Sequence, residues 1–125
     1  MTREEICDRV ICDSSSLESE GLGHKFVVQH DGQQLETFVL RFRGNVYGYL
    51  NRCPHLFLEL DYEEGEFFDI SGDYIICANH GALFEPESGK CVSGPCYESS
   101  LEPIPVIEID SVVMIDDDNY TRVQD

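Results

Sequence analysis

Apolar and polar residues alternate over short stretches of this chain, and Gly, Pro, Asn or Asp separates most of the stretches. The alternation is clearest in ETFVLRF at 36–42, where Phe38, Leu40 and Phe42 share one face of an extended chain. A period of two residues is typical of a strand. The same pattern predicts further strands in KFVVQH at 25–30, NVYGYL at 45–50, YII at 74–76, ALF at 82–84, LEPIPVIEI at 101–109 and VVMI at 112–115.

Glycine-containing turns connect these predicted strands. They fall at DG (31–32), RGN (43–45), EEGE (63–66), SGD (71–73) and PESG (86–89), and Asp110-Ser111 joins the last two strands. No segment beyond the first twenty residues keeps a helical period, and SSS at 14–16 can begin only one short turn. Short strands at close spacing favour an all-β fold of sandwich or barrel type. A length of 125 residues without a repeat predicts one domain, with a polar tail over 116–125 that we expect to be flexible.

The charge of the chain narrows the range of partners. It has 25 acidic and 8 basic residues and a formal net charge of −17. This excess argues against nucleic acid and anionic membranes as partners, and it favours a partner with a basic face. No apolar run is long enough to cross a bilayer, and the N-terminal MTREEICDRV lacks the apolar segment of a signal peptide, so we expect a cytoplasmic protein.

Two short motifs, CPH at 53–55 and CANH at 77–80, each pair a thiol with an imidazole. Each follows an apolar run, which places it at a loop tip at the end of a predicted strand. A structural zinc finger usually pairs Cys with Cys and His with His, whereas this chain has C-x-H, 21 residues, and then C-x-x-H. Mixed pairs suit two metal atoms with different ligand sets, one held by Cys53 and Cys77 and the other by His55 and His80.

These motifs, at this separation and with Gly81 after the second, resemble the two cluster-binding loops of Rieske-type [2Fe–2S] proteins. The resemblance covers roughly 24–115 and includes NVYGYLNRCPH, DYIICANHGALFEPESGKCVSGP and a Gly94-Pro95 pair where the family has a loop that shields the cluster. It implies a Rieske-like fold of small antiparallel sheets, formed by a single domain over 1–125, with a cluster-binding part roughly over 50–98 at one end.

The resemblance also implies the ligands of one [2Fe–2S] cluster. Cys53 and Cys77 would bind the buried iron, and the Nδ1 atoms of His55 and His80 would bind the outer iron. One position departs from the family pattern: Phe57 stands where many members have glycine, although this removes no ligand.

Two features of high-potential members of that family are missing here. The loop-to-loop disulfide of those proteins would join the positions of Leu58 and Asn79, and their two hydroxyl donors would stand at Ala82 and Phe84. Hydrogen bonds to sulfur stabilise the reduced cluster, and negative protein charge destabilises it. We therefore expect a potential near the low end of the Rieske range, about −150 mV rather than +300 mV.

The sequence thus predicts an electron carrier and not an enzyme, because four protein ligands leave the cluster no open position for substrate. It would be a stand-alone ferredoxin that takes electrons from a flavoprotein reductase and passes them to an oxygenase or reductase. The oxygenase itself is excluded, since about thirty residues follow Pro95 and none is histidine. Three alternatives stay open at this point: a small Rieske subunit of a nitrite reductase type of enzyme, a Cys₂His₂ zinc domain with a structural or interaction role, and a domain that keeps the fold only for binding.

The remaining thiols and imidazoles receive ordinary structural interpretations. Cys91 and Cys96 are close enough in sequence to form a disulfide or to bind a second metal, but the favoured interpretation of both, as of Cys7 and Cys12, is a reduced thiol that packs as a small apolar group. His24 and His30 are expected to be surface residues. Arg52, beside Cys53, could orient the first loop or a docking partner.

Overall fold

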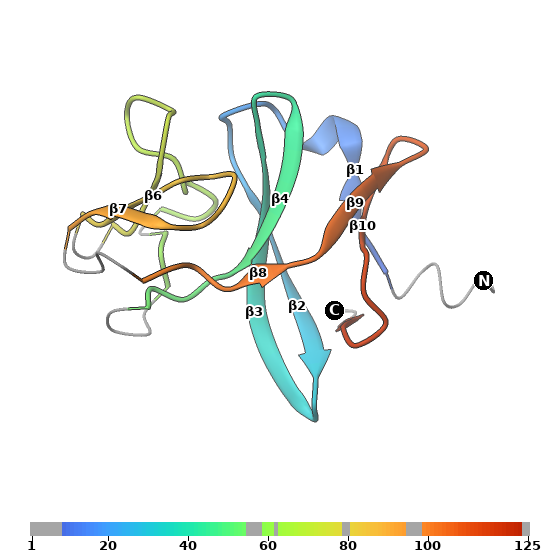
Figure 1. The fold of residues 1–125 in the computed structure, drawn as a ribbon. Coiled ribbons are helices and arrows are strands. Elements are labelled where there is room, and N and C mark those ends of the chain that lie inside the picture. Colours follow the sequence, from blue (N-terminus) through green and yellow to red (C-terminus); the bar gives the residue numbers. More distant parts are fainter. Residues whose placement is uncertain (1–8, 55–58, 62, 79–80, 95–98, 124–125) are drawn as a thin grey trace.

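The computed structural model of the protein describes residues 9–54, 59–61, 63–78, 81–94 and 99–123 (Figure 1). Its elements are β1 (Val10–Asp13), the 3₁₀ helix η1 (Ser14–Ser16), β2 (His24–His30), β3 (Gln33–Phe42), β4 (Asn45–Leu50), β5 (Ile75–Ile76), β6 (Leu83–Phe84), β7 (Cys91–Ser93), β8 (Pro103–Ile104), β9 (Val106–Ile109), β10 (Val112–Ile115) and β11 (Thr121–Arg122). They form three antiparallel sheets with the orders β1-β10-β9, β11-β2-β3-β4-β8 and β5-β6-β7. We call the five-stranded sheet the central sheet. The predicted all-β fold is confirmed. No helix in this described part of the chain is long and apolar enough to span a membrane.

Three two-residue turns fix the register of the hairpins. His30 pairs with Gln33 across Asp31 and Gly32, whose φ angles are 50° and 76°. Positive φ at both central residues is the geometry that matches the twist of the flanking strands. The turns at 43–44 and 110–111 have the same two positive φ angles. The turn signals DG, RGN and Asp110-Ser111 are therefore confirmed.

The strand β3 lies between two hydrophobic cores. Phe38, Leu40 and Phe42 belong to the core on one face of the five-stranded sheet, and Val39 belongs to the core on the other. Figure 1 shows the β5-β6-β7 sheet on one side of β3 and β4 and the β1-β10-β9 sheet on the other. We call the first core the site-side core; it consists of Phe38, Leu40, Phe42, Tyr49, Cys53, Leu60, Phe67, Ile75, Cys77, Ala82, Phe84, Cys91 and Leu101.

The Arg41 guanidinium joins several segments at the end of β3. It donates to the carbonyl oxygens of Leu17 (2.9 Å), Gly44 (2.8 Å) and Ser14 (3.3 Å). It also makes a bidentate ion pair with Glu108 in β9, with Nη1–Oε1 and Nη2–Oε2 distances of 3.0 and 2.5 Å. This hydrogen-bonded partner lowers the pKa of Glu108 to about 2. One side chain thus ties the central sheet to the β1-β10-β9 sheet.

The C-terminal segment, which we expected to be flexible, contains a short edge strand. Thr121–Arg122 form β11 and pair with β2, and the Val123 N–H donates to the carbonyl oxygen of Val27 (2.8 Å). Tyr120 stacks on His30 with ring centroids 4.4 Å apart. The polar sequence does not indicate this pairing, because the hydrogen bonds of an edge strand come from its backbone and need no particular side chains.

We predict that Arg41→Lys lowers the free energy of unfolding by about 1–3 kcal/mol, because an ammonium group cannot reach the same set of fixed acceptors. Urea unfolding followed by circular dichroism measures this loss. Arg43→Lys is the matched control, since Arg43 is exposed in the next turn and should change stability by less than about 0.5 kcal/mol. Equal losses in the two variants would contradict the role given to Arg41.

Candidate metal centre

The first expected ligand loop begins at the end of β4. The Leu50 N–H donates to the carbonyl oxygen of Glu102 (2.8 Å), and the Asn51 N–H donates to that of Glu36 (2.9 Å). Two residues later Cys53 is fully buried in the site-side core. The central sheet therefore fixes the backbone from which Cys53 projects.

The second expected ligand loop begins at the end of β5. The Cys77 N–H donates to the carbonyl oxygen of Ala82 (2.9 Å), and the Gly81 N–H donates to that of Cys77 (2.8 Å). These two bonds hold Gly81 and Ala82 against Cys77, and Cys77 itself is fully buried. The antiparallel pairing of β5 with β6 brings the chain back alongside β5.

A backbone hydrogen bond joins the two loops. The Ala78 N–H, next to Cys77, donates to the carbonyl oxygen of Leu60 on the returning arm of the first loop (2.9 Å). Cys53 and Cys77 share the site-side core, and their role as ligands of one buried iron stays a prediction. His55 and His80, with Phe57, Leu58 and Asn79, lie outside the described residues.

A third segment approaches the second loop from β7. Gly94 has a φ of 99°, and a Cβ atom added there would lie 2.8 Å from the Cα atom of Ala82. Only glycine permits such an approach at this backbone angle. Pro95 and Cys96 lie outside the described residues, so the shielding of the cluster by this loop stays a prediction.

The donor set fits a [2Fe–2S] cluster as far as the described residues reach. Cys53 and Cys77 offer two sulfur atoms from facing loops in an apolar core, and thiolates are the ligands that iron–sulfur clusters require. Within the described stretches no three His, Cys, Asp or Glu side chains gather as a metal site. Of the four expected ligands, only Cys53 and Cys77 fall within these stretches. Ala82 and Phe84 are fully buried and carry no hydroxyl group.

A buried polar group lies at the base of the first loop, and sequence reasoning missed it. The Asp61 carboxylate, whose side chain is fully buried, accepts hydrogen bonds from the Gly65 N–H (3.0 Å) and the Asn51 amide (3.1 Å) and pairs with Lys25 (3.2 Å). Burial opposes ionisation, but these bonds outweigh it and lower the pKa of Asp61. Polar residues at both ends of a loop that is otherwise apolar at LFLEL are the signal that could have indicated it.

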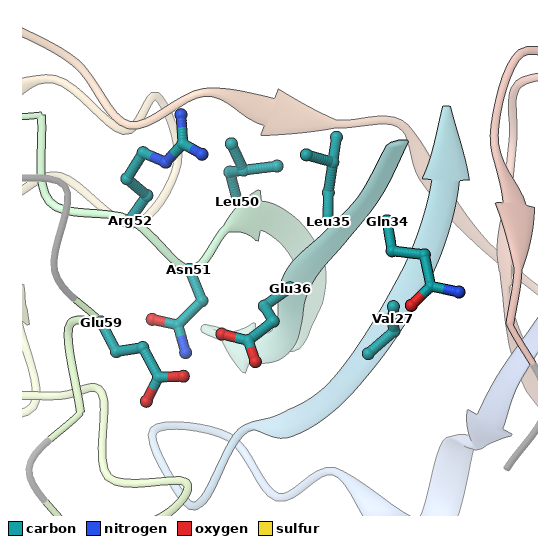
Figure 2. Close-up of a pocket in the computed structure, with 8 residues that line it drawn as sticks. All are labelled: Val27, Gln34, Leu35, Glu36, Leu50, Asn51, Arg52 and Glu59. Atoms are coloured by element: carbon teal, nitrogen blue, oxygen red, sulfur yellow. The ribbon is translucent and has the colours of Figure 1, made fainter. Parts of the chain in front are cut away.

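A polar groove of about 380 Å³ opens beside this loop. Figure 2 shows the Glu36 and Glu59 carboxylates pointing into one space beside Asn51, whereas Arg52 points away from them. The hydrogen bond to Glu36 is the main cause of a raised pKa at Glu59. Arg52 is exposed, so the proposal that it contacts a partner stays a prediction.

The other described thiols agree with the structural interpretation. Cys91 is fully buried, and its Sγ donates to the carbonyl oxygen of Ser93 (3.3 Å). Burial is the main reason why the pKa of Cys12 rises to about 11, so this thiol stays protonated at neutral pH. Cys7 lies outside the described residues. His30 is more engaged than a plain surface residue, because it stacks on Tyr120 and its Nδ1 hydrogen-bonds the carbonyl oxygen of Asn119 (2.9 Å).

Comparison with protein families decides the identity of the fold and its cofactor. The model of the Rieske [2Fe–2S] domain matches residues 8–117. The chain belongs to the Rieske [2Fe–2S] domain family. The expected Rieske-like fold is thereby confirmed, and the cofactor of this Rieske domain is one [2Fe–2S] cluster.

Several solved structures share this fold, and two of them are ferredoxins. The ferredoxin of carbazole 1,9a-dioxygenase from Nocardioides aromaticivorans IC177 is 23% identical, with a TM-score of 0.66 over 85% of this chain and 93% of that one. The Sphingomonas yanoikuyae B1 ferredoxin is 24% identical, with a TM-score of 0.64 over 86% and 96%. A chain from a complex of reduced oxygenase and oxidized ferredoxin in carbazole 1,9a-dioxygenase is 23% identical, with a TM-score of 0.67 over 85% and 89%. No curated protein sequence matches the chain significantly.

We predict that Gly94→Ala exposes the cluster of this Rieske domain. The added methyl group would meet the Ala82 backbone at 2.8 Å, so the segment after β7 must move away from the second loop. Bleaching of the visible absorption by an added oxidant should become several-fold faster, and stability should fall by about 2–4 kcal/mol from overpacking and backbone strain together.

Gly32→Ala is the control for backbone strain alone. Gly32 also has a positive φ, of 76°, but nothing lies within 4 Å of an added Cβ. This variant should lose about 1–2 kcal/mol and bleach at the wild-type rate. Equal bleaching rates in the two variants would show that the segment after Gly94 does not shield the cluster.

Proposed function

We propose that this Rieske domain is a ferredoxin that carries one electron at a time to an oxygenase, with its cluster bound by Cys53, His55, Cys77 and His80. The observation that carries the proposal is the placement of Cys53 and Cys77. Both are fully buried in one core, on two loops joined by a backbone hydrogen bond, in a chain that matches the Rieske family over 8–117. The family match disfavours the zinc alternative, which requires neither the mixed motifs nor the approach of Gly94.

The cluster, when bound, takes up and releases an electron, and the protein around it does the rest. The site-side core keeps water from the Cys53 and Cys77 sulfur atoms. The sheets hold both loops rigidly, which keeps small the reorganisation that accompanies each electron transfer. His55 and His80 would bind the outer iron and leave their other ring nitrogens near solvent, where a redox partner can approach.

The similar structures favour a stand-alone ferredoxin over a reductase subunit. The two ferredoxins match over 93% and 96% of their own lengths, so neither has a large part that this chain lacks. One related structure is a complex of reduced oxygenase and oxidized ferredoxin in carbazole 1,9a-dioxygenase. We infer that the acceptor of this chain is likewise an oxygenase and that the donor is a flavoprotein reductase. We also infer a cytoplasmic location, where both partners and reduced thiols are found.

The charge supports a partner with a basic docking face. A formal net charge of −17 speeds encounter with a basic surface and makes the rate fall as salt rises. The same charge opposes addition of an electron, as does the lack of hydroxyl groups at Ala82 and Phe84. We therefore infer a potential of about −150 mV, which suits electrons that come from a flavin.

We predict that Ala82→Ser raises the midpoint potential by about 50 mV, the equivalent of one hydrogen bond of about 1 kcal/mol to the cluster sulfur. A redox titration followed by visible absorption measures the shift. Ala78→Ser is the matched control, because Ala78 lies in the same loop but is exposed, and it should leave the potential unchanged. A wild-type midpoint that is clearly positive would contradict the low-potential assignment.

The proposed function is tested by measuring electron transfer into and out of the protein. We expect NADH and a dioxygenase-type flavoprotein reductase to reduce the purified holoprotein, and a Rieske oxygenase to reoxidise it, with both rates falling several-fold between low and high salt. Dithionite reduction controls for an intact cluster. The ferredoxin assignment would be contradicted if dithionite reduced the protein but neither a reductase nor an oxygenase of this kind exchanged electrons with it.

A further inference from the structure

The two ligand loops of this chain lack the disulfide that joins them in high-potential members. The positions of the disulfide in high-potential members are Leu58 and Asn79 here, so no disulfide can join the loops at those positions. The hydrogen bond from Ala78 to Leu60 crosses between the loops, but it can position them only if Leu60 is itself fixed.

Asn51 fixes Leu60. Its side chain lies at the outgoing end of the first loop, two residues before Cys53, and the residue is only 4% exposed. Its Oδ1 accepts the Leu60 N–H (2.9 Å), and its Nδ2 donates to Asp61 Oδ1 (3.1 Å). One amide group therefore closes the base of the loop that carries Cys53 and His55.

Asp61 connects this closure to the rest of the fold. Its second oxygen accepts the Gly65 N–H (3.0 Å) and lies 3.2 Å from the Lys25 ammonium, which belongs to β2 in the central sheet. The hydrogen bonds run without a break from β2 through Asp61, Asn51 and Leu60 to Ala78. This path reaches both ligand loops and uses no atom of the cluster.

We propose that Asn51 and Asp61 form a clasp that positions the first ligand loop against the second and replaces the mechanical role of the missing disulfide. A buried network with all partners in place is rigid, and loss of one member leaves the others unsatisfied. Unlike a disulfide, the clasp does not depend on the redox state of the compartment. The proposal rests on the proposed cluster site for its purpose, but the clasp itself consists of described residues alone.

A clasp differs from an ordinary stabilising contact in what its loss changes. A merely structural contact would lower the stability of the whole domain and leave the cluster spectrum alone. Loss of a positioning contact loosens the geometry around the cluster, so it should shift or broaden the g values of the reduced protein and speed cluster loss to a chelator. It should also speed deuterium exchange at Leu60 and Ala78, a signal that needs no cluster.

The test uses the holoprotein with Asn51→Asp, Asp61→Asn and the double exchange Asn51→Asp/Asp61→Asn. Each single variant removes or opposes one bond of the clasp, and we expect cluster loss and exchange at Leu60 and Ala78 to become about tenfold faster. In the double exchange, the carboxylate at position 51 can accept hydrogen bonds from the Leu60 N–H and from the amide group at position 61. The amide oxygen at position 61 can then accept the Gly65 N–H. The double exchange should return both rates to within about threefold of wild type, because the same donors again meet acceptors.

Arg41→Lys is the control for general destabilisation, because Arg41 ties the central sheet to the β1-β10-β9 sheet. Single variants that match Arg41→Lys, with lower stability but unchanged g values, cluster-loss rate and exchange at Leu60 and Ala78, would overturn the clasp. A double exchange that is no better than the single variants would do the same. Faster exchange in the single variants and its recovery in the double exchange would support the clasp even if the protein held no iron, in which case only the ferredoxin assignment would fail.

Discussion

The hydrogen bond from Ala78 to Leu60 is the contact on which the arrangement of the site depends. It joins two loops that start from different sheets, the first from β4 in the central sheet and the second from β5 in the smaller sheet (Figure 1). This backbone contact therefore fixes the second loop against the returning arm of the first. Strand β3, with a hydrophobic core on each face, is the rigid support beneath this joint.

Charge and burial act in the same direction at this site. The Cys53 and Cys77 side chains lie in an apolar core, the neighbouring positions Ala82 and Phe84 donate no side-chain hydrogen bond, and the protein as a whole is strongly acidic. Each of these features disfavours the addition of an electron to the cluster and so lowers its expected reduction potential. The proposed low potential and the proposed basic partner thus both follow from the negative charge of the protein.

The sequence predicted the features that local chemistry determines. Turns such as Asp31-Gly32 need two residues with positive φ, and the alternation in β3 follows from its pleat, so both could be derived from a few neighbouring residues. The pairing of β11 with β2 and the contacts of Asn51 with Leu60 and Asp61 could not. They join backbone or polar groups whose proximity is decided by the packing of several elements, and no single stretch of sequence carries that information.

The cysteine and histidine spacing was informative for a different reason, since a cluster imposes its own geometry on the loops that bind it. Cys53 and Cys77 are found in one core, and the assignment of these two residues and of His55 and His80 as cluster ligands stays a prediction. The most direct test is the visible spectrum of the purified protein, with electron paramagnetic resonance after dithionite reduction. We expect a red-brown protein whose reduced form gives a rhombic signal with an average g below the free-electron value. A colourless protein that carries zinc, even after anaerobic cluster reconstitution, would contradict the account.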